Sequence, residues 1–202
     1  NYDFHNLYKE LLNFCTVDLS AFYFDIRKDS LYCDSKDSKK RKSTIILLNV
    51  ILNSLLKWFA PILSFTTEEI YKLIMDDNKS IHLTKFLDYP KNFKNKNLNQ
   101  KWLELIKIRN VCNISIEEKR ASKEIGSSLE ASLKINLDKK LNEISKDVDF
   151  SELCITSSAE VSYLENSETK VQTSKAEGSK CQVCWKINKE ACSRKTCPKH
   201  TE

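Results

Sequence analysis

The sequence predicts a mainly α-helical fold, in which a helical bundle is followed by a small α+β segment and a C-terminal knuckle. Three observations support this. The 202 residues include only two glycines and three prolines against 41% hydrophobic residues, and Gly and Pro are the residues that interrupt helices. Apolar residues recur at helical spacing from the first residues onward. Beyond Gly126 the pattern changes to polar–apolar alternation.

The helical part extends to about residue 124. The third expected helix is the core of this part, because Asn49, Asn53 and Lys57 form only a narrow polar stripe on an otherwise apolar cylinder. Other helices must therefore surround it. The expected helices span about residues 3–12, 18–28, 38–59, 66–75 and 99–123.

Local signals predict where these helices begin and end. The turn-like cluster at residues 34–38 can cap the third helix, and Pro61 ends it. Thr66 and Glu69 have the spacing of a capping box, with Thr66 as N-cap. Gly126 is placed to stop the fifth helix.

The remaining chain is expected to be an α+β piece and a metal-binding tail, which gives domains at residues 1–124, 125–178 and 179–202. Because there is no initial Met or leader, we expect the chain to be part of a larger protein. The expected elements are a strand at 130–137, a short helix at 138–146, one or two strands at 153–164, and a weak strand or linker at 167–180.

The last residues have the spacing of a zinc site. Cys181 and Cys184 are separated by two residues, and Cys197 and His200 repeat this gap twelve residues later. Four filled positions would make one structural Zn²⁺ site, since none remains for an activated water. Cys192 is the alternate ligand. A redox Cys-x-x-Cys pair is disfavoured, because no thioredoxin-like βαβ pattern precedes it.

Composition points to a cytoplasmic, polyanion-binding protein. Residues 27–42, 79–107 and 170–202 are rich in Lys and Arg, within a net charge of +5, and such segments favour RNA or DNA as a partner. The alternative is a solvated lysine-rich surface. No membrane span is expected, since polar residues interrupt the most apolar run, residues 45–63. Eight cysteines without a signal peptide indicate thiols in a reducing compartment.

Candidate RNA contacts lie at a helix start and in the tail. Cations at a helix N-terminus oppose the helix dipole, which hints at an anionic partner. Trp185 could stack on a base or pack as the core of the knuckle, and we favour packing. Arg109 and Arg120 are expected to form salt bridges.

No arrangement of residues typical of a catalytic site is present. The candidate RNA contacts are Lys39, Lys40, Arg41, Lys42, Trp185, Lys186, Arg194, Lys195 and Lys199.

Several segments resemble the anticodon-binding domain and zinc-binding tail of bacterial isoleucyl-tRNA synthetase, a class I aminoacyl-tRNA synthetase. The resemblance covers nearly the whole chain in the right order. Its most specific parts are Ile-Gly-Ser-Ser-Leu-Glu-Ala at 125–131 and Cys-Gln-Val-Cys-Trp at 181–185. It is also carried by Asp-Phe-His at 3–5, residues 13–23, residues 28–32, and the Ala-Pro-Ile-Leu-Ser-Phe-Thr-Thr-Glu-Glu-Ile run at 60–70.

The resemblance implies a protein that grips the anticodon stem-loop of tRNA(Ile), acts as a monomer, and belongs to an isoleucine–tRNA ligase. The family's N-terminal catalytic core, which uses ATP and Mg²⁺, and its editing domain are absent, so the fragment alone is expected to be inactive. The family's second knuckle is usually Cys-x-x-Cys, whereas His200 stands here. Two alternatives stay open: the anticodon domain of a valyl or leucyl synthetase, and a zinc-knuckle protein-interaction module.

Overall fold

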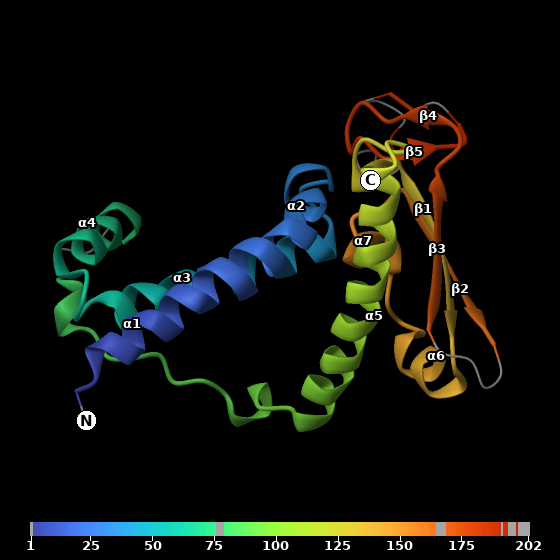
Figure 1. The fold of residues 1–202 in the computed structure, drawn as a ribbon. Coiled ribbons are helices and arrows are strands. Elements are labelled where there is room, and N and C mark those ends of the chain that lie inside the picture. Colours follow the sequence, from blue (N-terminus) through green and yellow to red (C-terminus); the bar gives the residue numbers. More distant parts are fainter. Residues whose placement is uncertain (1, 76–78, 165–168, 191, 194–196, 198–202) are drawn as a thin grey trace. The chain divides into compact units, whose positions relative to one another are not determined.

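The computed structural model describes residues 2–75, 79–164, 169–190, 192–193 and 197. The chain forms two compact units, residues 1–93 and residues 94–202 (Figure 1). The first unit is helical, whereas the second combines helices with two small sheets. The expected boundary after residue 124 therefore falls inside the second unit, because the helix before Gly126 packs on the sheet that follows it.

The first unit begins with one continuous helical run where two separate helices were expected. It consists of α1 (Phe4–Asn13), a π-helical segment (Phe14–Phe24) and α2 (Asp25–Tyr32). Asp3 caps the run, since its side chain accepts a hydrogen bond from the backbone N–H of Asn6 at 3.1 Å. Within the π-helical segment, the Thr16 hydroxyl donates to the Leu12 carbonyl at 2.9 Å. Such side-chain bonds compete with the regular backbone repeat.

Helix α3 (Lys39–Phe59) confirms the expected central helix of this unit. Ser38 is its N-cap and Pro61 follows its end. It packs against α4 (Ser64–Ile74) and the 3-10 turn η2 (Ile81–Leu83). A second 3-10 turn, η3 (Lys91–Phe93), closes the unit. The buried contacts between these elements come from Leu56, Ala60, Tyr71 and Ile81.

The expected capping box at the start of α4 is wrong. The helix begins at Ser64, so Thr66 lies inside it, and the Thr67 hydroxyl donates back to the Leu63 carbonyl at 3.0 Å. Glu68, rather than Glu69, has the structural role. Its carboxylate accepts from the Ser80 hydroxyl at 2.8 Å and the Ile81 N–H at 2.9 Å. Glu68 therefore holds the loop at η2 against α4.

The second unit is built on α5 (Lys96–Ala121), which buries Leu105, Ile108, Cys112 and Ile116 at helical spacing. The helix does not end at Gly126 as expected. Lys123 has the left-handed backbone conformation, with φ of 59°, and the Glu124 N–H bonds back to the Lys119 carbonyl at 3.1 Å. A lysine thus takes the position that glycine usually fills after a helix.

Helix α5 packs on a three-stranded mixed sheet of order β2-β1-β3. The central strand β1 (Ala131–Leu137) is parallel to β2 (Ser158–Tyr163) and antiparallel to β3 (Lys170–Lys175). Alternate residues of β1 are fully buried, as the alternation predicts. Ser115 of α5 and Thr173 of β3 share a hydrogen bond of 2.7 Å between their hydroxyls.

Short helices connect these strands. The 3-10 turn η4 (Ser128–Glu130) leads into β1, and α6 (Lys139–Ser145) follows it, capped by the side chain of Asp138. The strand expected from Leu153 begins later, because α7 (Phe150–Leu153) occupies its start. Asp149 caps α7 and so turns this apolar stretch into helix.

The chain continues into a two-stranded sheet of β4 (Ser179–Lys180) and β5 (Ile187–Asn188), which run antiparallel. Gly178 precedes β4 with φ of +130°, a conformation that only glycine adopts readily. A Cβ atom there would lie 2.0 Å from the Asn188 carbonyl oxygen. Among the described residues, no helix is long and apolar enough to cross a membrane.

Candidate functional site

Three cysteines converge between and beyond the strands of the small sheet. Cys181, Cys184 and Cys197 are buried, and their Sγ atoms all lie within 4.8 Å of one another. The Sγ atoms of Cys181 and Cys197 are 3.6 Å apart. Thiolates that share a tetrahedral zinc ion are about 3.8 Å apart, as Zn–S bonds of about 2.3 Å require. The cluster could therefore bind a metal.

Backbone hydrogen bonds shape the turn that carries the first two thiols. The Trp185 N–H bonds to the Cys181 carbonyl at 3.1 Å, and the Cys181 N–H bonds to the Lys186 carbonyl at 2.8 Å. The Val183 N–H also points at the Cys181 sulfur, at 3.3 Å. Backbone N–H groups directed at a sulfur favour its thiolate form, the form that binds a metal.

The electrostatics of the Cys181 thiol agree with a ligand role. Burial opposes ionisation, but hydrogen bonds from Cys192 and from the backbone N–H groups of Cys184 and Val183 outweigh it. Together they lower the pKa of Cys181 to about 6. Cys181 therefore reaches its thiolate form more readily than an ordinary cysteine does.

Of the two candidates for the fourth ligand, His200 lies outside the described residues. Cys192 is described, and it lies near the cluster without belonging to the group of three sulfurs within 4.8 Å. The Asn188 side-chain amide donates to the Cys192 sulfur at 3.4 Å.

The cysteine loop is fixed to the rest of the second unit by two contacts that the sequence did not reveal. The Ile187 N–H donates to the Ser157 hydroxyl at 2.6 Å. The Lys186 ammonium lies 3.5 Å from both the carbonyl oxygen and the hydroxyl of Ser151. Lys186 is only 8% exposed and joins the cysteine loop to Ser151. Its contact with RNA stays a prediction.

Trp185 contradicts the expectation that it packs as the core of the knuckle, because 61% of the residue is exposed. Its backbone is left-handed, with φ of 64°. The Lys180 ammonium lies 5.2 Å from the centre of its ring system, within the range of a cation–π contact. The turn thus presents a flat aromatic surface beside a positive charge.

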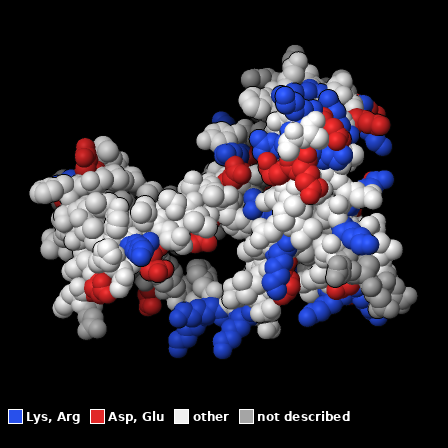
Figure 2. All heavy atoms as spheres, viewed as in Figure 1, with Lys and Arg blue, Asp and Glu red and all other residues white. Residues whose placement is uncertain are grey.

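Other predicted cations of the tail, namely Arg194, Lys195 and Lys199, lie outside the described residues. Figure 2 shows Lys and Arg side chains gathered at the end of the second unit that holds β4 and β5, interspersed with acidic ones. The described part of the tail contributes Lys180 and Lys189, which are both exposed. The sign of the local charge is thus mixed rather than uniformly positive.

The predicted cations at the start of α3 stand at a helix N-terminus, as expected. Ser38 accepts a hydrogen bond from the Arg41 N–H at 3.4 Å. Arg41 donates to the Asp34 carbonyl at 2.8 Å, and Lys42 pairs with Asp37 at 2.9 Å. The hydrogen bond from Lys42 lowers the pKa of Asp37. Lys39 and Lys40 are exposed.

Comparisons with known proteins show which proteins this chain is similar to. A family model described as the anticodon-binding domain of tRNA ligase matches residues 1–135. The isoleucine–tRNA ligase of Pelagibacter ubique is 70% identical over 96% of this chain and 21% of its own length. That of Agrobacterium fabrum is 39% identical over 92% of this chain and 20% of its own. The chain therefore spans about a fifth of the length of these relatives.

Proposed function

The chain belongs to the anticodon-binding domain family of tRNA ligases, and from this membership we propose that it is the tRNA-binding part of an isoleucine–tRNA ligase. One observation carries the proposal: 70% identity to an isoleucine–tRNA ligase extends over 96% of the chain. An alignment of that extent reaches well beyond the 135 residues of the family match. The partner would be the anticodon stem-loop of tRNA(Ile).

The tail would hold one structural Zn²⁺ through Cys181, Cys184 and Cys197, with His200 as fourth ligand and Cys192 as the alternate. The three buried sulfurs support this assignment. When bound, the ion would crosslink the loop and supply folding energy to a segment with little apolar core of its own. Its role would be to fix Trp185 and its neighbours in place.

RNA would be held by stacking and by charge. Unpaired loop bases are recognised by stacking on aromatic or guanidinium planes and by hydrogen bonds to their edges. Trp185, exposed beside Lys180, is suited to such stacking. Lys39, Lys40, Arg41 and Lys42 of the first unit, and Arg194, Lys195 and Lys199 of the tail, would supply salt-sensitive phosphate contacts.

Activation of isoleucine with ATP and Mg²⁺, and editing, would belong to the remaining four fifths of the longer relatives. In that arrangement the fragment binds tRNA in the cytoplasm and carries out no chemistry by itself. Its partners would be those other domains and one tRNA, with the protein acting as a monomer.

A filter-binding titration tests the proposal. The zinc-loaded chain is titrated with an isoleucine tRNA transcript and with the same transcript carrying a changed anticodon, at two salt concentrations and again after chelation of zinc. We expect the correct anticodon to bind more tightly and chelation to remove the difference. If both transcripts bind equally and salt weakens both equally, the chain binds RNA only through non-specific electrostatic attraction. Failure to bind either transcript at low salt would instead favour a protein-interaction module.

A further inference from the structure

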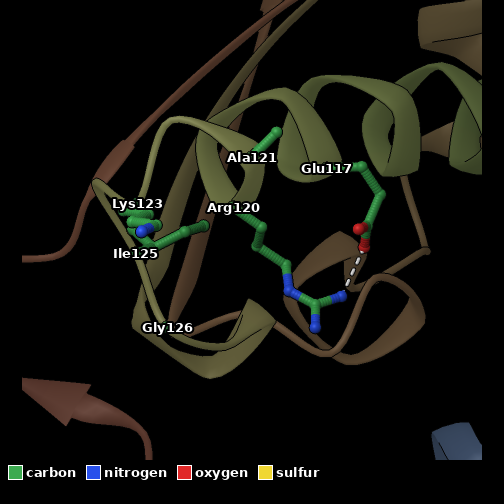
Figure 3. Close-up of a pocket in the computed structure, with 6 residues that line it drawn as sticks. All are labelled: Glu117, Arg120, Ala121, Lys123, Ile125 and Gly126. Carbon is green, nitrogen blue, oxygen red and sulfur yellow. Dashed lines mark hydrogen bonds and ion pairs between the residues drawn. The ribbon is translucent and has the colours of Figure 1, made fainter.

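A cavity of about 480 Å³ lies where α5 ends, in the second unit (Figure 3). Its lining comes from the last turn of α5 and from the turn that follows. Neither the metal site nor the predicted RNA contacts include it. The lining residues are Glu117, Arg120, Ala121, Lys123, Ile125 and Gly126.

The cavity is lined by both charged and apolar side chains. Ala121 is exposed and supplies apolar surface, whereas Ile125 is only 3% exposed. Glu117 and Arg120 project from the same side of α5 (Figure 3), and the Arg120 Nη1 atom lies 2.7 Å from the Glu117 Oε1 atom. The ion pair confirms the salt bridge expected for Arg120. Its side chains remain 63% and 47% exposed, so a ligand can reach them.

The Glu117–Arg120 pair presents an acceptor group next to a donor group. One lone pair of Glu117 is used by Arg120, which leaves most of the carboxylate free to accept two further N–H bonds. Arg120 has five N–H donors in a planar fork, and the pair uses one. A planar ligand with two adjacent N–H donors followed by an acceptor would complement this pair.

We propose that this cavity binds an unpaired guanine of the RNA. Guanine offers N2–H and N1–H side by side, and O6 beside them, on one planar edge. Glu117 would accept from the two N–H groups, Arg120 would donate to O6, and the ring would lie on Ala121. Uracil, cytosine and adenine lack two adjacent ring-edge donors next to an acceptor. The inference rests on the proposed RNA-binding function, which it deepens by assigning a base-reading subsite.

The location of the cavity argues against a phosphate as its occupant. The C-terminal end of a helix carries partial negative charge, so an anion in contact with the last turn of α5 is disfavoured. A neutral base that donates hydrogen bonds suits this end instead. Lys123 lines the cavity as well.

Fluorescence anisotropy with short RNAs tests the subsite. The zinc-loaded 202-residue chain is titrated with labelled UUGUU, with UUIUU, in which inosine lacks the 2-amino group, and with UUUUU. We expect UUGUU to bind about tenfold more tightly than UUUUU, the discrimination typical of one bidentate base contact, with UUIUU in between. Glu117→Gln should abolish the preference for guanine. Glu118→Gln, at the next residue of the helix, which is exposed but does not line the cavity, should keep it.

Equal affinity for the three RNAs, no binding of any of them, or an unchanged preference in Glu117→Gln overturns the inference. Thermal melts of both variants show whether they remain folded. The tRNA titration described above separates this failure from that of the proposed function. A chain that still distinguishes tRNA anticodons but shows no guanine preference keeps the function and loses only this subsite.

Discussion

The hydroxyl of Ser157 accepts a hydrogen bond from the backbone N–H of Ile187 at 2.6 Å. The same hydroxyl donates to the Leu129 carbonyl. Ser157 immediately precedes β2, Leu129 precedes β1, and Ile187 begins the strand that follows the first two cysteines. One small side chain thus attaches the cysteine loop to the mixed sheet.

Ser157→Ala should therefore loosen this attachment. The substitution leaves the Ile187 N–H without its partner, which typically costs about 1–3 kcal/mol of unfolding free energy. Chemical denaturation of the zinc-loaded chain measures it. Ser162→Ala, on an exposed position of β2, is the matched control and should change stability by less than about 0.5 kcal/mol. Equal effects of the two substitutions would contradict the role of Ser157.

Gly178→Ala should disrupt the small sheet. The added Cβ atom would meet the Asn188 carbonyl oxygen at 2.0 Å, and the backbone φ of +130° strains any other residue by about 1–3 kcal/mol. We expect a lower unfolding free energy and weaker zinc retention in a chelator competition. At Gly126, the same substitution places Cβ 3.6 Å from Glu130, an ordinary contact. Gly126→Ala should therefore be tolerated, and a comparable loss in both variants would refute the argument.

Glu68 should make the first unit sensitive to acid. Hydrogen bonds from Lys72 and Ser80, which outweigh the opposing effect of burial, lower the pKa of Glu68 from 4.5 to about 2. Because the folded pKa lies below the unfolded one, its stabilising effect is complete above about pH 4.5 and is lost as the pH falls towards 2.

Thermal unfolding across this pH window provides the measurement. Glu68→Gln should be less stable than the parent chain at neutral pH and should lose less of its melting temperature between pH 5 and pH 2. Glu69→Gln, at an exposed neighbouring position, should follow the parent curve. Parallel curves for Glu68→Gln and the parent would show that this carboxylate does not stabilise the loop.

Lys39 and Lys40 should contribute to RNA affinity through charge. A plot of log affinity against log salt concentration falls, and each lysine that contacts a phosphate increases the magnitude of its slope by about 1. The double substitution of both lysines by glutamine should therefore weaken tRNA binding at low salt and reduce the slope by about 2. Lys9→Gln, on the exposed side of α1, serves as a control for net charge. A slope unchanged from the parent would leave the pair as solvated surface residues.

Trp185→Ala should weaken tRNA binding without unfolding the tail, because the side chain is largely exposed. Stacking of one base on an aromatic ring contributes about 1–3 kcal/mol, or roughly 5- to 150-fold in affinity. Trp185→Phe should retain part of it. The tRNA titration measures both variants, and zinc content confirms that the cysteine cluster is intact. An alanine variant that binds tRNA normally would exclude stacking on this ring.

Sequence patterns anticipated the elements whose determinants lie within one turn of chain. Ser38 and Asp138 accept from nearby N–H groups wherever the rest of the protein lies, so the starts of α3 and α6 were predictable. The alternation in β1 likewise requires only one buried face. The two-residue gap between Cys181 and Cys184 is also local, and it indicated a cysteine cluster that could bind a metal.

Local patterns failed where the sequence allows two alternatives and contacts or backbone conformation in the folded chain select one of them. Both Glu68 and Glu69 could act near the start of α4, and only the position of Ser80 and Ile81 selects Glu68. An apolar stretch around Leu153 could form strand or helix, and the cap at Asp149 together with packing beside β2 selects helix. Gly126 is a plausible helix stop, but Lys123 adopts the left-handed conformation first.

By itself, the sequence determined that the chain is mainly helical, that it resembles the tRNA-binding part of a synthetase, and which thiols can meet on one turn. The tertiary structure alone decided that Lys186 is buried against Ser151 while Trp185 is exposed beside Lys180. The physical reason is burial. The side chains of these two adjacent residues point in different directions. Which of them is exposed depends on the segments that pack against the turn, and a local sequence pattern does not specify those segments.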